Sequence, residues 1–157
     1  MAYFLDTSAY AKLYHHEPGS DHLHSLVQNP AVTLIISTLT LVEMESVLAI
    51  KVRTGELNPH GQQLARRRLQ SDLAQRRIEL GPALNSHHYQ NARQLLIAHA
   101  ISLGLRTLDA IQAAVCLELN QTSQITALLA SDHRLCRVAE VNGCPALDPA
   151  APNFILP

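Results

Sequence analysis

The stretch AYFLDTSAY, residues 2–10, places a short apolar run directly before a carboxylate and two hydroxyl side chains. Ala2 to Leu5 is typical of a buried strand, whereas Asp6, Thr7 and Ser8 are typical of the start of a helix. A buried strand that ends on a carboxylate has two explanations. Either the side chain caps the following helix, or it faces a ligand.

Further apolar runs of this kind recur along the chain, and longer helical patterns separate them. We expect strands at residues 2–5, 32–37, 78–80, 126–130 and 146–147, and helices near residues 8–16, 20–28, 39–54, 58–77, 86–103, 109–120 and 133–142. Strands that alternate with helices predict an α/β fold with a mostly parallel sheet of about five strands. One domain is expected at residues 1–148, followed by a C-terminal tail at residues 149–157.

The composition restricts the class of protein. The chain has 157 residues, of which 47% are hydrophobic, enough for one domain with a sizeable core. Its three cysteines form no C-x-x-C pair, and its nine histidines form no H-E-x-x-H, so we expect free thiols and surface histidines. There is no signal-peptide pattern and no apolar run near the roughly 18 residues of a membrane span. A cytoplasmic protein without membrane contact is therefore expected.

The formal net charge is −1, so the overall charge does not indicate a nucleic-acid binder. Residues 51–77 nevertheless contain seven basic residues against two acidic ones. The basic residues are Lys51, Arg53, Arg66, Arg67, Arg68, Arg76 and Arg77. This segment is either a solvated helix face or a surface that holds phosphates.

Four acidic residues lie close to the points where predicted strands give way to helices. Asp6 follows the first strand, Glu43 the second and Asp132 the fourth, while Asp109 opens the helix before the fourth strand. Ligands of an open parallel sheet bind beyond the carboxyl ends of its strands, so we expect these side chains to converge. Each also has a simpler explanation, because Asp is a preferred N-cap and Thr40 to Glu43 has the spacing of a capping box.

Capping does not explain the four acids equally well as a set. Carboxylates gathered in one crevice repel one another, and burial raises their pKa values. A hard divalent cation relieves this repulsion, and Mg²⁺ binds through carboxylates, waters and phosphate oxygens. The set therefore indicates metal-assisted hydrolysis of a phosphodiester. No P-loop, G-x-G-x-x-G or G-x-S-x-G motif supports a rival chemistry.

Four segments in this order resemble PIN-domain ribonucleases, and within that family the VapC-type toxins of bacterial toxin–antitoxin pairs. The segments are FLDTSAYAKLYHHEPGS from residue 4, STLTLVEMESVLA from residue 37, LRTLDAIQAAVCLEL from residue 105 and LLASDHRLCRVAEVNGCPALDP from residue 128. The acids that match the family's motifs are Asp6, Glu43, Asp109 and Asp132. The resemblance covers nearly the whole chain.

The resemblance implies a three-layer α/β/α domain that cleaves RNA with Mg²⁺ or Mn²⁺ as cofactor, leaving a 5′-phosphate and a 3′-hydroxyl. It implies that Asp6 and Asp109 are the principal metal ligands and that Asp132 helps to hold the metal or its waters. Glu43 would bind a metal-bound water or orient the attacking one. The implied partners are a second copy of the chain, in a homodimer, and a cognate antitoxin whose C-terminal segment covers the acidic site.

Several points remain open from the sequence. Helical periodicity does not choose between Glu43 and Glu45, and only the resemblance to a T-x-x-E motif selects Glu43. Many family members carry Thr or Ser two places before the fourth acid, where this chain has Ala130, so Ser131 or a hydroxyl of residues 7–8 is the candidate replacement. A non-catalytic module that binds RNA or a partner, and a small-molecule phosphatase, are alternatives because fold does not fix function.

Overall fold

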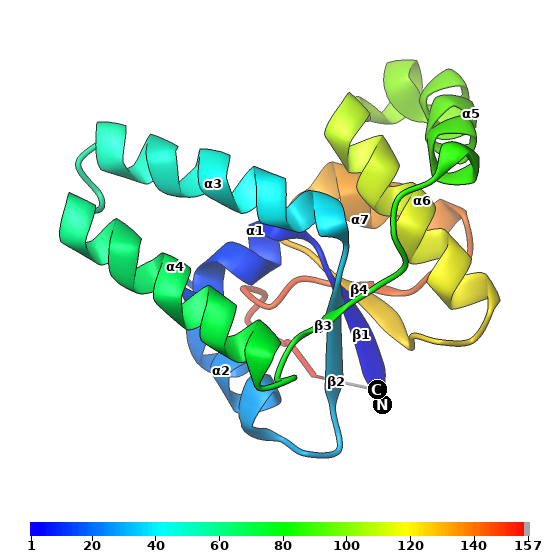
Figure 1. Cartoon of the computed structure of the whole chain (residues 1–157). Coiled ribbons are helices and arrows are strands. Elements are labelled where there is room, and N and C mark those ends of the chain that lie inside the picture. The colour runs from blue at the N-terminus through cyan, green and yellow to red at the C-terminus, as the bar shows by residue number, and fades with distance from the viewer. Residues whose placement is uncertain (156–157) are drawn as a thin grey trace.

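The structure, a computed structural model, describes residues 1–155, in which short strands alternate with helices (Figure 1). The strands are β1 (Ala2–Leu5), β2 (Thr33–Ile36), β3 (Glu79–Leu80), β4 (Ala127–Leu129) and β5 (Ala146–Leu147). The helices are α1 (Thr7–Tyr10), the 3₁₀ helix η1 (Ala11–Leu13), α2 (Ser20–Gln28), α3 (Thr38–Arg53), α4 (Pro59–Ala74), α5 (Ser86–Leu103), α6 (Thr107–Gln121) and α7 (His133–Val141).

All five strands form one parallel sheet in the order β3-β2-β1-β4-β5, as the alternating pattern predicted. β1 is the central strand and pairs with β2 on one side and β4 on the other. The chain moves outward from β1 to β2 and β3 and then returns to the opposite side of β1. The carboxyl ends of β1 and β4 therefore flank a topological switch point, where open α/β sheets bind their ligands.

Two hydrophobic cores cover the two faces of the sheet, because alternate side chains of a strand point in opposite directions. On one face Phe4, Ile35 and Leu128 pack against α5, α6 and α7. On the other face Tyr3 and Leu5 pack with α1, η1, α2, α3 and α4. In Figure 1, α3 and α4 form an antiparallel arm on one side and α5 and α6 lie on the other. The predicted three-layer α/β/α fold is confirmed.

Two predicted helices are shorter in the structure. The helix expected at residues 8–16 is a single α-helical turn continued by η1, because the hydroxyl of Ser20 donates to the Lys12 carbonyl (2.7 Å) and turns the chain away. The helix expected at residues 58–77 ends at Ala74, before Arg76 adopts a left-handed backbone with φ of 53°. Such a backbone conformation is incompatible with a continuing right-handed helix.

The predicted tail, residues 149–157, extends two residues beyond the described part of the chain. Within the described part it packs on α2. The Pro149 carbonyl lies 2.9 Å from Nδ1 of His22, and the ring of Phe154 stacks on the same imidazole at a centroid distance of 5.1 Å.

The structure also bears on the expectations from composition. No helix within residues 1–155 is long and apolar enough to cross a membrane. Cys116, Cys136 and Cys144 are free thiols. The expectation that the histidines lie at the surface is wrong for His88, which is fully buried. Its Nδ1 accepts a hydrogen bond from the Asn85 amide (3.2 Å) at the start of α5, so the ring serves as part of a helix cap.

Candidate active site

Asp6 lies at the carboxyl end of β1, where its backbone and side chain have separate partners. Its amide donates to the Leu129 carbonyl of β4 (3.0 Å), which continues the sheet pairing by one residue. Its Oδ2 accepts from the Ser8 amide (2.9 Å), so Asp6 is also the N-cap of α1. The capping explanation is therefore correct for Asp6. The cap uses only one oxygen of the carboxylate, Oδ2, and the residue is only 5% exposed.

Asp132 lies in the turn that follows β4 and is the N-cap of α7. Its Oδ1 accepts from the amides of Arg134 (2.8 Å) and Leu135 (3.2 Å), and no residue within 1–155 donates to Oδ2. The preceding residue ties this loop to α1, since the Ser131 amide donates to the Ser8 hydroxyl (2.9 Å). The turns after β1 and β4 are thus held side by side.

Asp109 does not open its helix as predicted, because α6 begins at Thr107 and Arg106 is its N-cap. Asp109 lies in the first turn instead. Its Oδ2 is buried and has no hydrogen-bond partner among the described residues. A buried carboxylate oxygen without a donor is costly, so this atom is the clearest indication that the site is built to bind a cation.

Glu43 also lies in the site without a capping role. α3 begins at Thr38 with Ser37 as its N-cap, so the capping box expected from Thr40 to Glu43 does not form. Its Oε2 accepts hydrogen bonds from Thr7 Oγ1 (2.6 Å) and from a buried glutamine of α6, Gln112 (2.6 Å). Of the candidate hydroxyls, that of Thr7 therefore contacts Glu43, whereas that of Ser131 donates to Asp148 (2.7 Å).

Glu45, the alternative to Glu43, lies elsewhere on α3. Its carboxylate is exposed and forms a two-point ion pair with the Arg66 guanidinium of α4. Successive residues of a helix are 100° apart, so residues 43 and 45 point about 200° apart around the axis. The structure brings Glu43, and not Glu45, to the other three acids.

The four carboxylates interact electrostatically across the elements that carry them. Burial raises the pKa of Asp6 from 3.8 to about 6, and the negative charge of Glu43 adds to the rise, while hydrogen bonds from Ser8 oppose it. Burial likewise raises the pKa of Asp109, with further contributions from Asp132 and Glu43. The guanidinium groups of Arg106 and Arg134 act in the opposite direction on Asp109.

These observations fit a hard divalent cation. The donors are carboxylate oxygens, two of the carboxyl groups have raised pKa values, and one buried oxygen has no hydrogen-bond partner in the described part of the chain. A bound cation would reduce the repulsion between the carboxylates and give the buried oxygen a partner.

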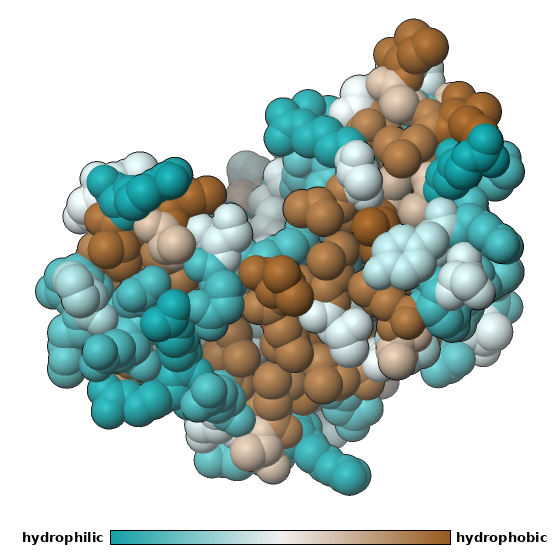
Figure 2. All heavy atoms as spheres, turned by 45° about the horizontal axis from the view of Figure 1, so that its top comes forward, coloured by the Kyte–Doolittle hydropathy of each residue, from teal (hydrophilic) through white to brown (hydrophobic). Residues whose placement is uncertain are grey.

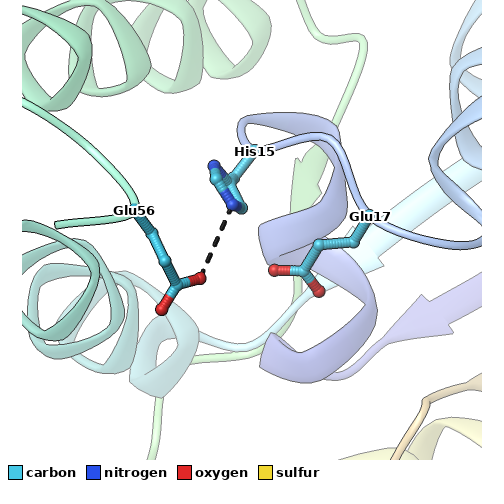
Figure 3. A group of neighbouring side chains, drawn as sticks. All are labelled: His15, Glu17 and Glu56. Atoms are coloured by element: carbon cyan, nitrogen blue, oxygen red, sulfur yellow. Dashed lines mark ion pairs between the residues drawn. The ribbon is translucent and has the colours of Figure 1, made fainter. Parts of the chain in front are cut away.

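A tighter group of potential metal ligands lies outside this site. The ligand atoms of His15, Glu17 and Glu56 all lie within 4.8 Å of one another, and Figure 3 shows His15 facing Glu56 from the neighbouring segment. Lys51 forms ion pairs with both glutamates, and Lys12 lies 3.4 Å from Glu17. The two ammonium groups already balance the two carboxylates, so this group is a salt-bridge network that joins η1 and the segment after it to the arm.

A hydrophobic pocket of about 250 Å³ adjoins Glu43. It is lined by Thr7, Leu39, Val42, Glu43, Ser46, Val47 and Leu108. Val42 and Leu108 are large apolar side chains that remain exposed at 68% and 47%. Figure 2 shows hydrophobic residues gathered in the hollow between the α3–α4 arm and the side of α5 and α6.

The basic segment at residues 51–77 is less available than its sequence indicated. Lys51, Arg66 and Arg77 each form an ion pair with an acidic side chain. Arg67 and Arg68 are exposed on α4 and take part in no ion pair among the described residues. The role of residues 51–77 in holding phosphate stays a prediction.

The comparisons with known proteins agree with this architecture. The family model described as "PIN domain" matches residues 3–141. VapBC2 from Rickettsia felis, bound to a promoter DNA fragment, has a similar structure with a TM-score of 0.62 and 16% identity, covering 94% of this chain and 98% of that one. No curated protein matches the sequence.

Two further solved structures have the same fold. VapC20 from Mycobacterium tuberculosis, described as a sarcin-ricin loop cleaving toxin, gives a TM-score of 0.61 and 16% identity over 90% of this chain and 95% of that one. VapBC-1 from nontypeable Haemophilus influenzae gives a TM-score of 0.60 and 19% identity over 96% of this chain and 100% of that one.

Proposed function

Because the chain belongs to the PIN domain family, we propose that it is a metal-dependent endoribonuclease and the toxin of a toxin–antitoxin pair. The observation that carries the proposal is the buried Oδ2 of Asp109, which lies beside three other carboxylates and has no hydrogen-bond partner within residues 1–155. A protein that only binds RNA has no need to gather groups that repel one another and raise one another's pKa values.

Asp6 and Asp109 are the residues that would hold Mg²⁺ or Mn²⁺, with Asp132 holding the ion or its waters. When bound, the cation supplies Lewis-acid stabilisation of phosphate charge and a more acidic water. Glu43 would hold a water of the cation and orient the attacking water, since Thr7 and Gln112 fix its Oε2 and no residue within 1–155 donates to Oε1.

Substrate phosphate would meet positive charge on the α6 and α7 side of the site. Arg106 and Arg134 are close enough to Asp109 to act on its pKa, and both side chains are exposed. Arginine forms charge-assisted hydrogen bonds with phosphate oxygens, often two at a time. We assign these two residues to the RNA backbone nearest the cleaved bond, and the unpaired cations of α4 to more distant phosphates.

Two protein partners belong to the proposal. Solved structures with this fold include VapBC complexes, which supports a cognate antitoxin for this chain. The pocket lined by Leu39, Val42 and Leu108 adjoins Glu43, so a segment bound there would also cover the acids. A homodimer, a cytoplasmic location and a single functional domain at residues 1–148 complete the proposal.

The test is cleavage of total RNA by the purified chain in Mg²⁺, in excess chelator, and with Asp109→Asn. Asn keeps the shape of Asp but loses the charge, so a structural role alone would leave cleavage largely intact. We expect cleavage in Mg²⁺ that disappears in chelator and in the variant. Glu45→Gln is the matched control, because it removes a carboxylate from the same site-bearing arm without touching the acids.

The other outcomes refute the proposal in different ways. Cleavage that ignores both the chelator and the substitution points to a contaminating nuclease. RNA binding in chelator without cleavage in Mg²⁺ or Mn²⁺ favours the non-catalytic module. Hydrolysis of small phosphomonoesters without RNA cleavage favours the phosphatase.

A further inference from the structure

Gln112 is a fully buried amide in α6, one turn after Asp109. No pattern in the sequence singles out Gln112, because one glutamine in a helix usually faces solvent. A buried primary amide carries two donors and an acceptor that must be satisfied within the protein. The hydrogen-bond partners of Gln112 therefore indicate the role of the residue.

The hydrogen bonds of Gln112 reach three other places in the fold. Its Nε2 lies 2.6 Å from Glu43 Oε2, 2.9 Å from Thr40 Oγ1 and 3.2 Å from Thr7 Oγ1. Its Oε1 accepts from the hydroxyl of Ser37 (2.7 Å), the N-cap of α3. One side chain of α6 thus binds α1, the first turns of α3, and the acid that α3 carries.

The direction of this network is fixed by chemistry. A carboxylate only accepts hydrogen bonds, so Gln112 must point its NH₂ group at Glu43. The Thr40 amide donates to Ser37 Oγ (3.2 Å), and the Ser37 hydroxyl donates in turn to Gln112 Oε1. A continuous chain of donors therefore runs from the N-terminus of α3 through Gln112 and ends on Glu43.

The result is a carboxylate with one fixed oxygen and one available oxygen. Thr7 and Gln112 both donate to Glu43 Oε2, which fixes the side-chain torsions of a residue that otherwise has three rotatable bonds. No residue within 1–155 donates to Oε1. The same glutamine is joined through one helical turn to Asp109, so the relative placement of two acids from α3 and α6 depends on it.

We propose that Gln112 is a positioning residue that acts through Glu43 and sets its geometry relative to Asp109 for metal binding. The inference deepens the proposed function, and it concerns the same site. Partners that orient metal ligands typically contribute about 10- to 100-fold to metal affinity when they are removed. A glutamine that merely fills space would contribute to stability and not to metal affinity.

The experiment measures Mn²⁺ affinity by calorimetry, without RNA, for the full chain and four variants. They are Gln112→Met, Glu43→Gln, the double substitution and a structural control. Gln112→Met keeps the size of the side chain and removes its hydrogen bonds. We expect it to weaken Mn²⁺ binding at least about tenfold. In a Glu43→Gln background the same substitution should change the affinity less than about twofold, because the residue through which it acts is already altered.

Leu119→Ala is the matched structural control. Leu119 is buried in the same helix but outside the network, so its substitution should lower stability and leave Mn²⁺ affinity within about twofold of the unsubstituted chain. If Gln112→Met does not fold, Ser37→Ala removes the donor to Gln112 Oε1 and should weaken Mn²⁺ binding in the same Glu43-dependent way.

The proposal is overturned if Gln112→Met lowers stability but keeps the affinity of the unsubstituted chain, or if its effect is the same with and without Glu43. Absence of Mn²⁺ binding by the unsubstituted chain overturns it together with the proposed function. Coupled Mn²⁺ binding without RNA cleavage supports the role of Gln112 and refutes only the nuclease. Cleavage that needs metal, without coupling, refutes only the role of Gln112.

Discussion

Asp6→Asn is expected to stabilise the metal-free protein at neutral pH although it removes a proposed metal ligand. The carboxyl is buried, and its pKa is raised from 3.8 to about 6 in the folded state. Since one pKa unit corresponds to about 1.4 kcal/mol, ionised Asp6 costs the folded protein about 3 kcal/mol relative to the unfolded chain. Asn keeps the N-cap oxygen that accepts from the Ser8 amide, and it carries no charge.

The pH dependence of this effect has a definite sign. A group whose pKa is raised on folding binds its proton more tightly in the folded state, so its contribution to stability is complete below about pH 4 and is lost as the pH rises through about 6. Asp6→Asn has no ionisable group at this position, so its stability does not fall in this way as the pH rises. The free energy of unfolding of Asp6→Asn minus that of the unsubstituted chain should therefore rise by up to about 3 kcal/mol between about pH 4 and pH 7.

The assay is urea unfolding followed by circular dichroism across this pH range in excess chelator. Glu45→Gln removes an exposed carboxylate and should leave stability within about 0.5 kcal/mol at every pH. Addition of Mg²⁺ at a hundredfold excess over Kd should then cancel most of this difference, since only the unsubstituted chain gains about 2.7 kcal/mol. A flat difference curve in chelator, or a variant that becomes less stable as the pH rises, would refute the reasoning.

Three further outcomes are expected. Ser8→Ala removes a hydroxyl that lowers the pKa of Asp6, so the acidic limb of the cleavage rate against pH should move to higher pH, and an unmoved limb would separate Asp6 from catalysis. Replacing Arg67 and Arg68 together with Gln should reduce the slope of log affinity for single-stranded RNA against log salt by about 1.4, whereas an unchanged slope would assign both to solvated surface. Leu48→Ala, at a side chain 1% exposed on the core face of α3, should cost about 2–5 kcal/mol in urea unfolding, and a smaller loss would mean that the arm carries little of the stability.

The elements of the fold were readable because their signals are local. Helices at residues 20–28 and 86–103 and the first and last strands have the predicted bounds, because their apolar patterns are local. Gly19 directly precedes the first of these helices and Gly104 directly follows the second. The failures were also local in cause. The helix predicted at residues 8–16 ends early because the hydroxyl of Ser20, which lies outside that segment, donates a hydrogen bond to the Lys12 carbonyl.

The same difference between local and distant signals separates the site residues that the sequence located from those that it did not. Asp6 and Asp132 could be located from the sequence because each directly follows a buried strand, and parallel strands end at one edge of a sheet. Glu43 could not be chosen over Glu45 from periodicity, because both have apolar neighbours at helical spacing. The choice depends on the rotation of α3 about its axis, which is set by packing against the sheet.

The sequence by itself determined the α/β class, the order of elements and the three aspartates of the site, because these follow from side-chain patterns within a few residues. Only the tertiary structure decided which charges are neutralised and which polar groups meet. Arg66 pairs with Glu45 across 21 residues, and Gln112 reaches Thr7 across 105. Contacts at such separations depend on how whole helices pack on the sheet, and no local pattern in the sequence encodes that packing.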